Sequence, residues 1–306
     1  METRKIGPLN VSIVGLGCNN FGGRIDADAS RSVIDASLDA GINFFDTADI
    51  YGGTRSEEFL GRALGTRREQ VILASKFGVR INDAMPGGAK PEYIRRAVED
   101  SLRRLNTDRI DLYQLHLPDD TTPITDTLGA LNELVQAGKI RQVGCSNFSA
   151  AQLQEAEAAV VPGAAHFVSV QNDYSLLKRD PEVEVLPECE KLGIAFLPYF
   201  PLASGLLTGK YRQGQPLPEG ARIKSDNSFS KLLTEKNLDI VEKLIAFAES
   251  RGHTILELAF SWLLTRKPVA SVIAGATKPE QIAKNAAAAD WILTDEDLTK
   301  IDMILA

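Results

Sequence analysis

The run Gly41-Ile42-Asn43-Phe44-Phe45-Asp46 is short, mostly apolar and ends on a carboxylate. Two later runs have the same form, because Val71 to Ser75 is followed by Lys76 and Ile110 to Leu115 is followed by His116. Parallel strands direct their carboxyl ends to one rim of a barrel, where such proteins keep their reacting groups. The three runs therefore predict that polar side chains far apart in sequence meet at one rim.

The same pattern continues along the chain. Four more apolar runs end on a polar or small residue: Ser146-Asn147 after Ile140 to Cys145, Gln171 after Phe167 to Val170, Tyr199 after Ile194 to Leu197, and Gly275 after Ser271 to Ala274. With Val11 to Leu16 these runs make eight expected strands. Segments of helical periodicity separate them, with predicted starts at Asp28, Thr54 (a capping box), Pro91, Pro123, Ser149, Pro181, Thr234, Thr254 and Thr294. Alternating strands and helices predict an α/β fold, a (β/α)8 TIM barrel, with one domain over residues 1–306.

Bulk composition narrows the class of protein. A formal net charge of −7 and a pI near 5.2 disfavour nucleic acid or an anionic membrane as partner, which leaves small molecules or further copies of the chain. The longest apolar stretch, Ile194 to Ala203, is too short to span a membrane, and the start of the chain lacks a signal-type apolar segment. Cys18, Cys145 and Cys189 have no paired spacing for disulfides or a metal. We therefore expect a cytoplasmic protein with reduced thiols and no metal site.

One long stretch has no regular pattern. Gly205 to Ser230 is rich in Gly, Pro, Arg and Lys. Loops of that length in compact domains are often lids or binding loops, so we expect this segment to border a ligand site.

Several blocks of the chain resemble one protein family. Phe45 to Gly52, followed by Ser56-Glu57-Glu58 and Leu60 to Leu64, resembles the aldo-keto reductase signature. Further blocks agree in order and spacing: Ser75-Lys76, Asp111 to His116, Gly144 to Phe148, Val170 to Asn172, and Pro201 to Lys210. The resemblance implies a (β/α)8 barrel, a nicotinamide dinucleotide cofactor, usually NADP(H), and reversible reduction of a carbonyl group.

Carbonyl reduction needs a hydride, which no side chain supplies, and a proton for the developing alkoxide. Tyr51 is the candidate proton donor, and a neighbouring cation would lower the pKa of its phenol from about 10. Lys76 can be that cation, kept charged by Asp46, while His116 can donate a hydrogen bond to the substrate oxygen. These four residues match the catalytic tetrad of the family. The alternative for each residue is a structural role. Tyr51 would be exposed at the rim, Asp46 and Lys76 would form a surface ion pair, and His116 would have its hydrogen bonds satisfied within the fold.

The resemblance also assigns residues to the nicotinamide. Ser146, Asn147 and Gln171 match positions that hydrogen-bond its carboxamide, and Tyr199 matches the aromatic residue that stacks on its ring. A Ser-Asn pair after a strand is often a helix N-cap, but Ser149 is the better cap here, which leaves Ser146 and Asn147 free.

The first strand end has a glycine pattern. Gly15 to Asn20 is similar to a Rossmann fingerprint, but Asn20 occupies the third glycine position. We therefore expect Gly17 and Cys18 to let the backbone approach the cofactor in another way.

The segment Gly275 to Asn285 matches the adenosine-phosphate site of the family. It assigns Gly275, Lys278, Gln281 and Asn285 to the cofactor, together with Leu202 from the Pro201 to Lys210 block. The chain departs from the family pattern at Gly275-Ala276 (often basic-Ser), Gln281 (often Arg), Lys284 (often Glu) and Phe200 (often Ser). Lys278 either replaces the missing charge or is a solvated lysine at a helix start. The resemblance favours NADP(H) over NAD(H).

Two other classes of protein stay open. Some members of this family are auxiliary subunits that sense nicotinamide state. A metal-dependent barrel hydrolase would need His and acidic clusters at strand ends, but of His116, His166 and His253 only one ends a strand.

For the substrate, little chain follows the helix that starts at Thr294, so we expect no long C-terminal loop over the pocket. We place Asn19 and the loop Asp119 to Thr122 near its mouth. The expected substrates are small aldehydes and sugar-like or hydroxylated carbonyl compounds rather than steroids.

Overall fold

The computed structural model describes residues 1–217 and 231–306. Eight parallel strands form one sheet in the order β10-β3-β4-β5-β6-β7-β8-β9. They are β3 (Val14–Gly17), β4 (Phe44–Asp46), β5 (Ile72–Phe77), β6 (Ile110–Leu115), β7 (Ile140–Ser146), β8 (Phe167–Asp173), β9 (Ala195–Tyr199) and β10 (Val272–Gly275). The two ends of the sheet meet, because Phe196 of β9 forms a parallel bridge with Val269 just before β10. This arrangement confirms the expected (β/α)8 barrel.

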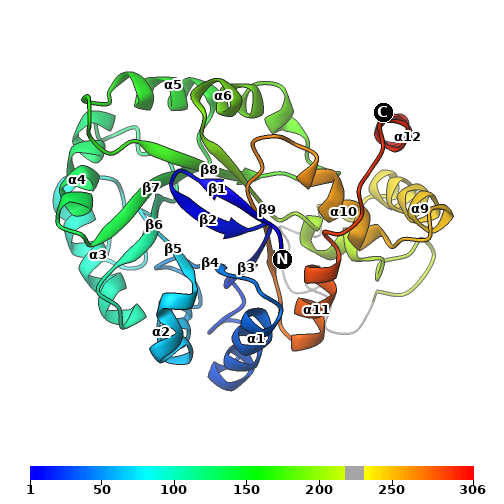
Figure 1. Ribbon diagram of the computed structural model, residues 1–306, viewed down its shortest axis with the longest axis horizontal. Helices are drawn as coiled ribbons and strands as arrows, with labels where there is room; N and C mark the ends of the chain where they lie inside the picture. Colours follow the sequence, from blue (N-terminus) through cyan, green and yellow to red (C-terminus); the bar gives the residue numbers. More distant parts are fainter. Residues whose placement is uncertain (218–230) are drawn as a thin grey trace.

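The helices surround the barrel (Figure 1). They are α1 (Ala27–Asp39), α2 (Arg55–Leu64), α3 (Pro91–Leu105), α4 (Ile124–Gln136), α5 (Ala150–Ala158), α6 (Val185–Leu192), α9 (Glu235–Ser250), α10 (Ile255–Leu264), α11 (Pro279–Ala287) and α12 (Asp295–Leu305). Short 3-10 segments are η1 (Gly65–Gln70), η2 (Asp180–Glu182) and η3 (Ala203–Thr208). Each helix from α1 to α6 contacts the next, and α11 contacts both α10 and α1, while α12 packs on α9.

The expected first strand was wrong in its extent. Val11 to Leu16 is divided, because β2 (Leu9–Ser12) ends before β3 and pairs antiparallel with β1 (Thr3–Ile6). Gly7 makes the tight hairpin possible, since its φ is +52°. Figure 1 shows this hairpin lying across the barrel. Its apolar side chains pack with barrel side chains, and we call this set the inner cluster: Ile6, Leu9, Val11, Phe44, Ala74, Leu112, Val168, Ala195, Leu197, Ala270 and Ile273.

Some predicted helix starts are confirmed and others are wrong. Ser149, Thr254 and Thr294 cap their helices with reciprocal capping boxes. The first helix is capped by Asp26 rather than Asp28, because the Asp26 side chain accepts the Ala29 N–H. Thr54 makes no capping bond.

The failure of Thr54 to cap its helix has a backbone cause. Gly52, Gly53 and Thr54 all have positive φ, which turns the Thr54 residue out of the extended conformation that a cap requires. Pro181 is the second residue of the short η2 and starts no α-helix, since α6 begins at Val185. Pro123 precedes α4 as its N-cap. In the predicted Gly205 to Ser230 loop, the first residues belong to η3, and 218–230 lie outside the described residues.

Candidate active site

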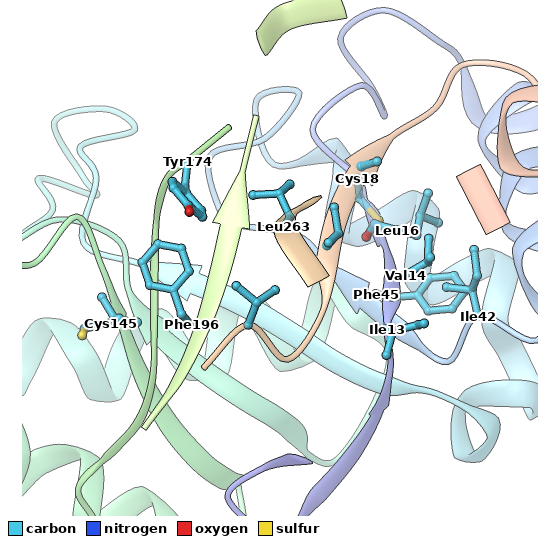
Figure 2. Close-up of a cluster of buried hydrophobic side chains, with 14 of the residues drawn as sticks. Ile13, Val14, Leu16, Cys18, Ile42, Phe45, Cys145, Tyr174, Phe196 and Leu263 are labelled. Atoms are coloured by element: carbon cyan, nitrogen blue, oxygen red, sulfur yellow. The ribbon is translucent and has the colours of Figure 1, made fainter. Parts of the chain in front are cut away.

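Strand geometry places three polar side chains inside the rim of the barrel. Side chains alternate between the two faces of a strand. On β4, Phe44 belongs to the inner cluster, whereas Phe45 packs with Val14 and Ile42 in the core between the sheet and the helices (Figure 2). Asp46, Lys76 and Gln114 each follow an inner-cluster residue by two positions, namely Phe44 of β4, Ala74 of β5 and Leu112 of β6. Their side chains therefore lie on the same face of the sheet as the inner cluster. All three are buried.

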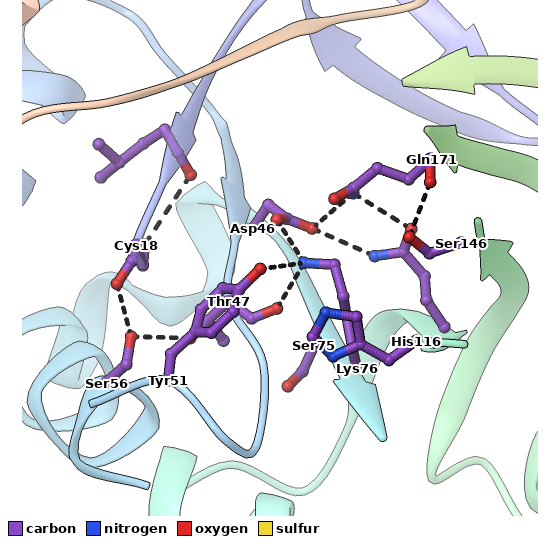
Figure 3. Close-up of polar contacts among 12 residues, drawn as sticks. Cys18, Asp46, Thr47, Tyr51, Ser56, Ser75, Lys76, His116, Ser146 and Gln171 are labelled. Carbon is purple, nitrogen blue, oxygen red and sulfur yellow. Dashed lines mark hydrogen bonds and ion pairs between the residues drawn. The ribbon is translucent and has the colours of Figure 1, made fainter. Parts of the chain in front are cut away.

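Lys76 is the centre of this polar layer (Figure 3). Its Nζ donates to Asp46 Oδ2 at 2.5 Å and to the Thr47 carbonyl at 2.9 Å. Burial acts to lower the pKa of the Lys76 ammonium, but the attraction of Asp46 and Tyr51 and the hydrogen bonds they form raise the pKa above its ordinary value. Lys76 is therefore a permanent cation at neutral pH.

Tyr51 reaches Lys76 from the turn that follows β4. The Lys76 Nζ lies 3.5 Å from the Tyr51 hydroxyl and 5.1 Å from the centre of its ring. As expected, the Lys76 ammonium acts to lower the pKa of the Tyr51 phenol. Burial raises the pKa of Tyr51 above its ordinary value, and Lys76 opposes this shift without overcoming it. The phenol thus keeps its proton at neutral pH.

His116 lies beside Tyr51. The two ring centres are 5.9 Å apart and the rings meet edge to face. Burial, with a smaller effect of Lys76, lowers the pKa of His116 to about 3, so its imidazole is neutral. Its Nδ1 is buried with no hydrogen-bond partner among the described residues. The structure thus brings the four predicted catalytic residues together.

The predicted nicotinamide residues form a connected group beside the tetrad. Asn147 donates to the His116 carbonyl and to Ser146 Oγ, both at 3.0 Å, and accepts the Tyr199 hydroxyl at 2.8 Å. Ser146 Oγ donates to the Gln171 carbonyl at 2.7 Å. Ser149 caps α5, so neither Ser146 nor Asn147 serves as the N-cap.

A cavity of about 730 Å³ joins the tetrad to the start of α11. Ten of the eleven predicted cofactor residues line it: Gly17, Ser146, Asn147, Gln171, Tyr199, Leu202, Gly275, Lys278, Gln281 and Asn285. The Gln281 oxygen accepts the N–H groups of Thr277 and Lys278, so this side chain also closes the start of α11.

Cys18 is the predicted cofactor residue that the cavity does not include. Its side chain is fully buried in the core between the sheet and the helices. Its N–H donates to the Asp46 carbonyl, and its own carbonyl accepts from Ser56 Oγ and from the Phe21 N–H. Strand β3 ends at Gly17. Of the two residues that we expected near the cofactor, Gly17 lines the cavity and Cys18 does not.

The structure corrects the predicted mouth of the pocket. Asp119 and Thr122 line a separate pocket of about 360 Å³ on the far side of the β6 loop. Asp119 there accepts hydrogen bonds from Ala89, Thr121 and Thr122, which hold it away from the main cavity. Asn19 does line the main cavity.

Sequence reasoning missed other lining residues. Asn20, Arg24, Val79 and Leu117 border the cavity from loops, and Ser204 and Thr208 from η3, none of which carries a periodic signal. It also missed Gln114, which lies behind the cavity wall and hydrogen-bonds Asp46. The available signals for Gln114 were a second polar residue besides Asp111 in a buried strand and its place in the block Asp111 to His116.

Comparison with known proteins agrees with this geometry. A sequence model described as Aldo/keto reductase family matches residues 13–306. The chain is 34% identical over 309 residues to the Schizosaccharomyces pombe aldo-keto reductase yakc, whose name carries the cofactor NADP(+), covering 98% of this chain and 90% of that protein. It is 35% identical over 298 residues to a probable voltage-gated potassium channel subunit beta of Oryza sativa subsp. japonica, covering 93% and 90%.

Among solved structures, the glycerol dehydrogenase AKR11B4 from Gluconobacter oxydans superposes with a TM-score of 0.86 and 36% identity, covering 100% of this chain and 95% of that one. The chain belongs to the aldo/keto reductase family. It is an NAD(P)-dependent oxidoreductase. In the described part of the chain, no helix is long and apolar enough to cross a membrane.

The residues of the cavity fit a nicotinamide dinucleotide in charge. Among the described residues, four cationic side chains line it, namely Arg24, Lys210, Lys278 and Lys284, although the whole chain has a net charge of −7. Such a wall favours an anion such as the phosphates of the cofactor. Gly275 leaves necessary room, because a Cβ there would lie 2.9 Å from Asn20 Nδ2. The Asn20 Oδ1 is buried without a hydrogen-bond partner among the described residues.

Proposed function

We propose that this protein reversibly reduces aldehydes, ketones or sugar carbonyls to alcohols, with Tyr51 as general acid. The observation that carries the proposal is the placement of the buried Lys76 Nζ between Asp46 Oδ2 and the Tyr51 hydroxyl, at 2.5 and 3.5 Å, where Asp46 and Tyr51 line the cationic cavity. Asp46 and the Thr47 carbonyl hold the ammonium in one position. A buried cation there stabilises negative charge that develops on the phenol oxygen.

The chain's own residues account for the proton side of the reaction. Tyr51 keeps its proton until the substrate oxygen gains negative charge, and then donates it. The neutral imidazole of His116 faces the same space and can donate a hydrogen bond that orients this oxygen. Ser146, Asn147, Gln171 and Tyr199 would hold the nicotinamide, which when bound supplies or accepts the hydride.

A second candidate function is that of an auxiliary subunit that senses nicotinamide state. The similarity to a probable potassium channel subunit beta is the observation that favours it. Both functions use the same cavity, but only the enzyme needs the complete Asp46, Tyr51, Lys76 and His116 set, which this chain has. We therefore place the enzyme first.

The test of the proposed function is a panel of carbonyl substrates with each cofactor. We expect oxidation of NADPH with glyceraldehyde-sized aldehydes and with aldoses, and little turnover of steroid ketones. The cavity wall carries polar Asn19 and Asn20 beside the apolar Val79 and Leu117, so hydroxylated substrates find hydrogen-bonding partners there that a steroid ketone would leave unused.

Measured kcat/KM values decide between the outcomes. A higher kcat/KM for steroid ketones than for glyceraldehyde would refute the substrate class. Tight NADPH binding without turnover of any carbonyl compound would favour the sensing subunit.

We also propose that the protein prefers NADP(H), with Lys278 contacting the 2′-phosphate. Lys278 lies at the start of α11 and lines the cavity with Lys284 and Lys210. Arg212 is directed elsewhere, since it pairs with Glu242 on α9. A phosphate near several cations gains strong charge-assisted hydrogen bonds.

Lys278→Ala is accordingly expected to weaken NADPH binding by about 1.5 to 3 kcal/mol and to leave NADH binding almost unchanged. Fluorescence titration of both cofactors measures this. Lys267→Ala is the matched control, because that lysine is exposed and does not line the cavity. Equal losses for both cofactors would remove Lys278 from the role and direct attention to Lys284 and Lys210.

A further inference from the structure

Gln114 is a fully buried amide whose hydrogen bonds all go to the active site. It lies on β6 in register with Lys76 of β5 and Gly144 of β7. Burial of an amide is unfavourable unless both its nitrogen and its oxygen find partners. Here the Nε2 donates to Asp46 Oδ1 at 3.1 Å, and the Oε1 accepts from Gln171 Nε2 at 3.4 Å.

These bonds divide the two oxygens of Asp46 between different partners. Among the described residues, Oδ2 accepts only from Lys76, whereas Oδ1 accepts from Gln114 and, at 3.0 Å, from Gln171. Figure 3 shows the Gln171 and Lys76 side chains approaching Asp46 from opposite sides. With Oδ1 held by two amides, the carboxylate plane cannot rotate, and Oδ2 stays directed at Lys76.

The two amides differ in their access to ligand. Gln171 lines the cavity, but Gln114 does not. Gln114 is therefore the donor that stays with Asp46 whatever occupies the cavity. Its neighbour on β7 makes room for it, because a Cβ at Gly144 would lie 3.2 Å from Gln114 Cγ and 2.6 Å from Ser169 Oγ.

We propose that Gln114 is a positioning residue of this active site, which holds Asp46 so that Lys76 remains fixed beside Tyr51. Gln114 itself touches neither the cavity nor Tyr51. This inference rests on the proposed function, since it acts through the Asp46–Lys76–Tyr51 contacts. It predicts effects on kcat rather than on cofactor binding.

The experiment compares Gln114→Met and Gln114→Glu in the full-length protein. Gln114→Met keeps the volume but removes both hydrogen bonds, and we expect kcat to fall about 10- to 100-fold, as for the loss of a hydrogen bond to a charged group. The NADPH dissociation constant, measured by fluorescence, should stay within about threefold, since Gln114 does not line the cavity. Gln142→Met, the same change on β7 beside the hairpin residue Gly7, is the matched control and should leave kcat unchanged.

Gln114→Glu separates positioning from packing. Glutamate has the shape of glutamine, but when ionised it repels Asp46, so at pH 8 we expect a larger loss of kcat than in Gln114→Met. The titratable groups that face it are Lys76 on the neighbouring strand β5 and Asp46 on β4, whereas Gly144 and Gln171 on β7 and β8 do not titrate. Lowering the pH toward 5 protonates the glutamate and restores a donor. The ratio of variant to wild-type kcat should therefore rise at least tenfold.

The outcomes are distinguishable. If the wild type turns over carbonyl compounds and Gln114→Met matches it, or Gln114→Glu equals wild type at every pH, the positioning role is overturned and the proposed function stands. If kcat falls only in step with loss of folded protein in thermal melts, Gln114 is structural and the inference is also overturned. If the wild type has no turnover with either cofactor, both the proposed function and this inference are overturned.

Discussion

At saturating cofactor, Tyr51→Phe is expected to lower kcat by about 10² to 10⁴ while cofactor affinity stays nearly unchanged. The change removes only the hydroxyl. Lys76 keeps its bonds to Asp46 and to the Thr47 carbonyl, so the polar layer retains its geometry. Steady-state kinetics with the best substrate of the panel, together with a NADPH titration, measure both quantities.

Tyr93→Phe is the matched control for this prediction. The Tyr93 hydroxyl is also buried, has no hydrogen-bond partner among the described residues and does not line the cavity. Its loss should leave kcat within a factor of about two. A Tyr51→Phe variant within a few-fold of the wild type would show that another group supplies the proton.

The second large effect concerns stability and the carboxyl of Asp49. This side chain is fully buried behind the tetrad, and neither oxygen has a hydrogen-bond partner in the described part of the chain. Burial, followed by repulsion from Glu57, raises the pKa of Asp49 from 3.8 to about 8. Glu57 has its own partners, Ser75 Oγ at 2.5 Å and Arg104 Nε at 2.7 Å.

The sign of the effect follows from linkage. Between pH 4 and pH 8 the folded protein holds a proton on Asp49 that the unfolded chain releases, so this group makes the free energy of unfolding fall as pH rises. The slope is about 1.4 kcal/mol per pH unit, and several kcal/mol accumulate over this range. Below pH 4 both states hold the proton and the penalty disappears.

Asp49→Asn should therefore stabilise the protein progressively more as pH rises, by several kcal/mol at pH 8 relative to pH 4. Urea unfolding at a series of pH values measures the difference between variant and wild type. Asp49→Ala is the companion variant, because it loses packing but must show the same pH slope. A difference that does not change with pH would contradict the raised pKa. Turnover should persist in Asp49→Asn, since the Asp49 contact to Lys76 is made by its backbone N–H.

Local sequence patterns were sufficient to predict the barrel and the strand ends at which Asp46, Lys76 and His116 meet. A period of two along each strand decides which side chains face inward, and the runs that end at Asp46 and Lys76 carry that information in themselves. Capping boxes, in which the two partner residues are three positions apart, such as Ser149 and Gln152, are equally local. These predictions needed no knowledge of what lies across the fold.

The incorrect expectations involve loops and backbone turns. Whether Asp119 or Leu117 borders the main cavity depends on the path of one loop, which hydrogen bonds from Ala89 and Thr122 decide. Cys18 turned out to lie in the core because its backbone groups bond to residues of β4 and α2. No periodic pattern in the sequence encodes such contacts.

The sequence by itself determined that this protein is an α/β barrel with Asp46, Tyr51, Lys76 and His116 at one rim, because strand periodicity and the apolar runs are properties of neighbouring residues. Only the tertiary structure decided what these groups do to one another. Gln114 and Gln171 reach Asp46 from 68 and 125 residues away, a meeting that exists only once the sheet has closed. The pKa of Tyr51 is raised and that of His116 lowered because burial, the largest effect on both, is a property of the packed barrel and of no single segment.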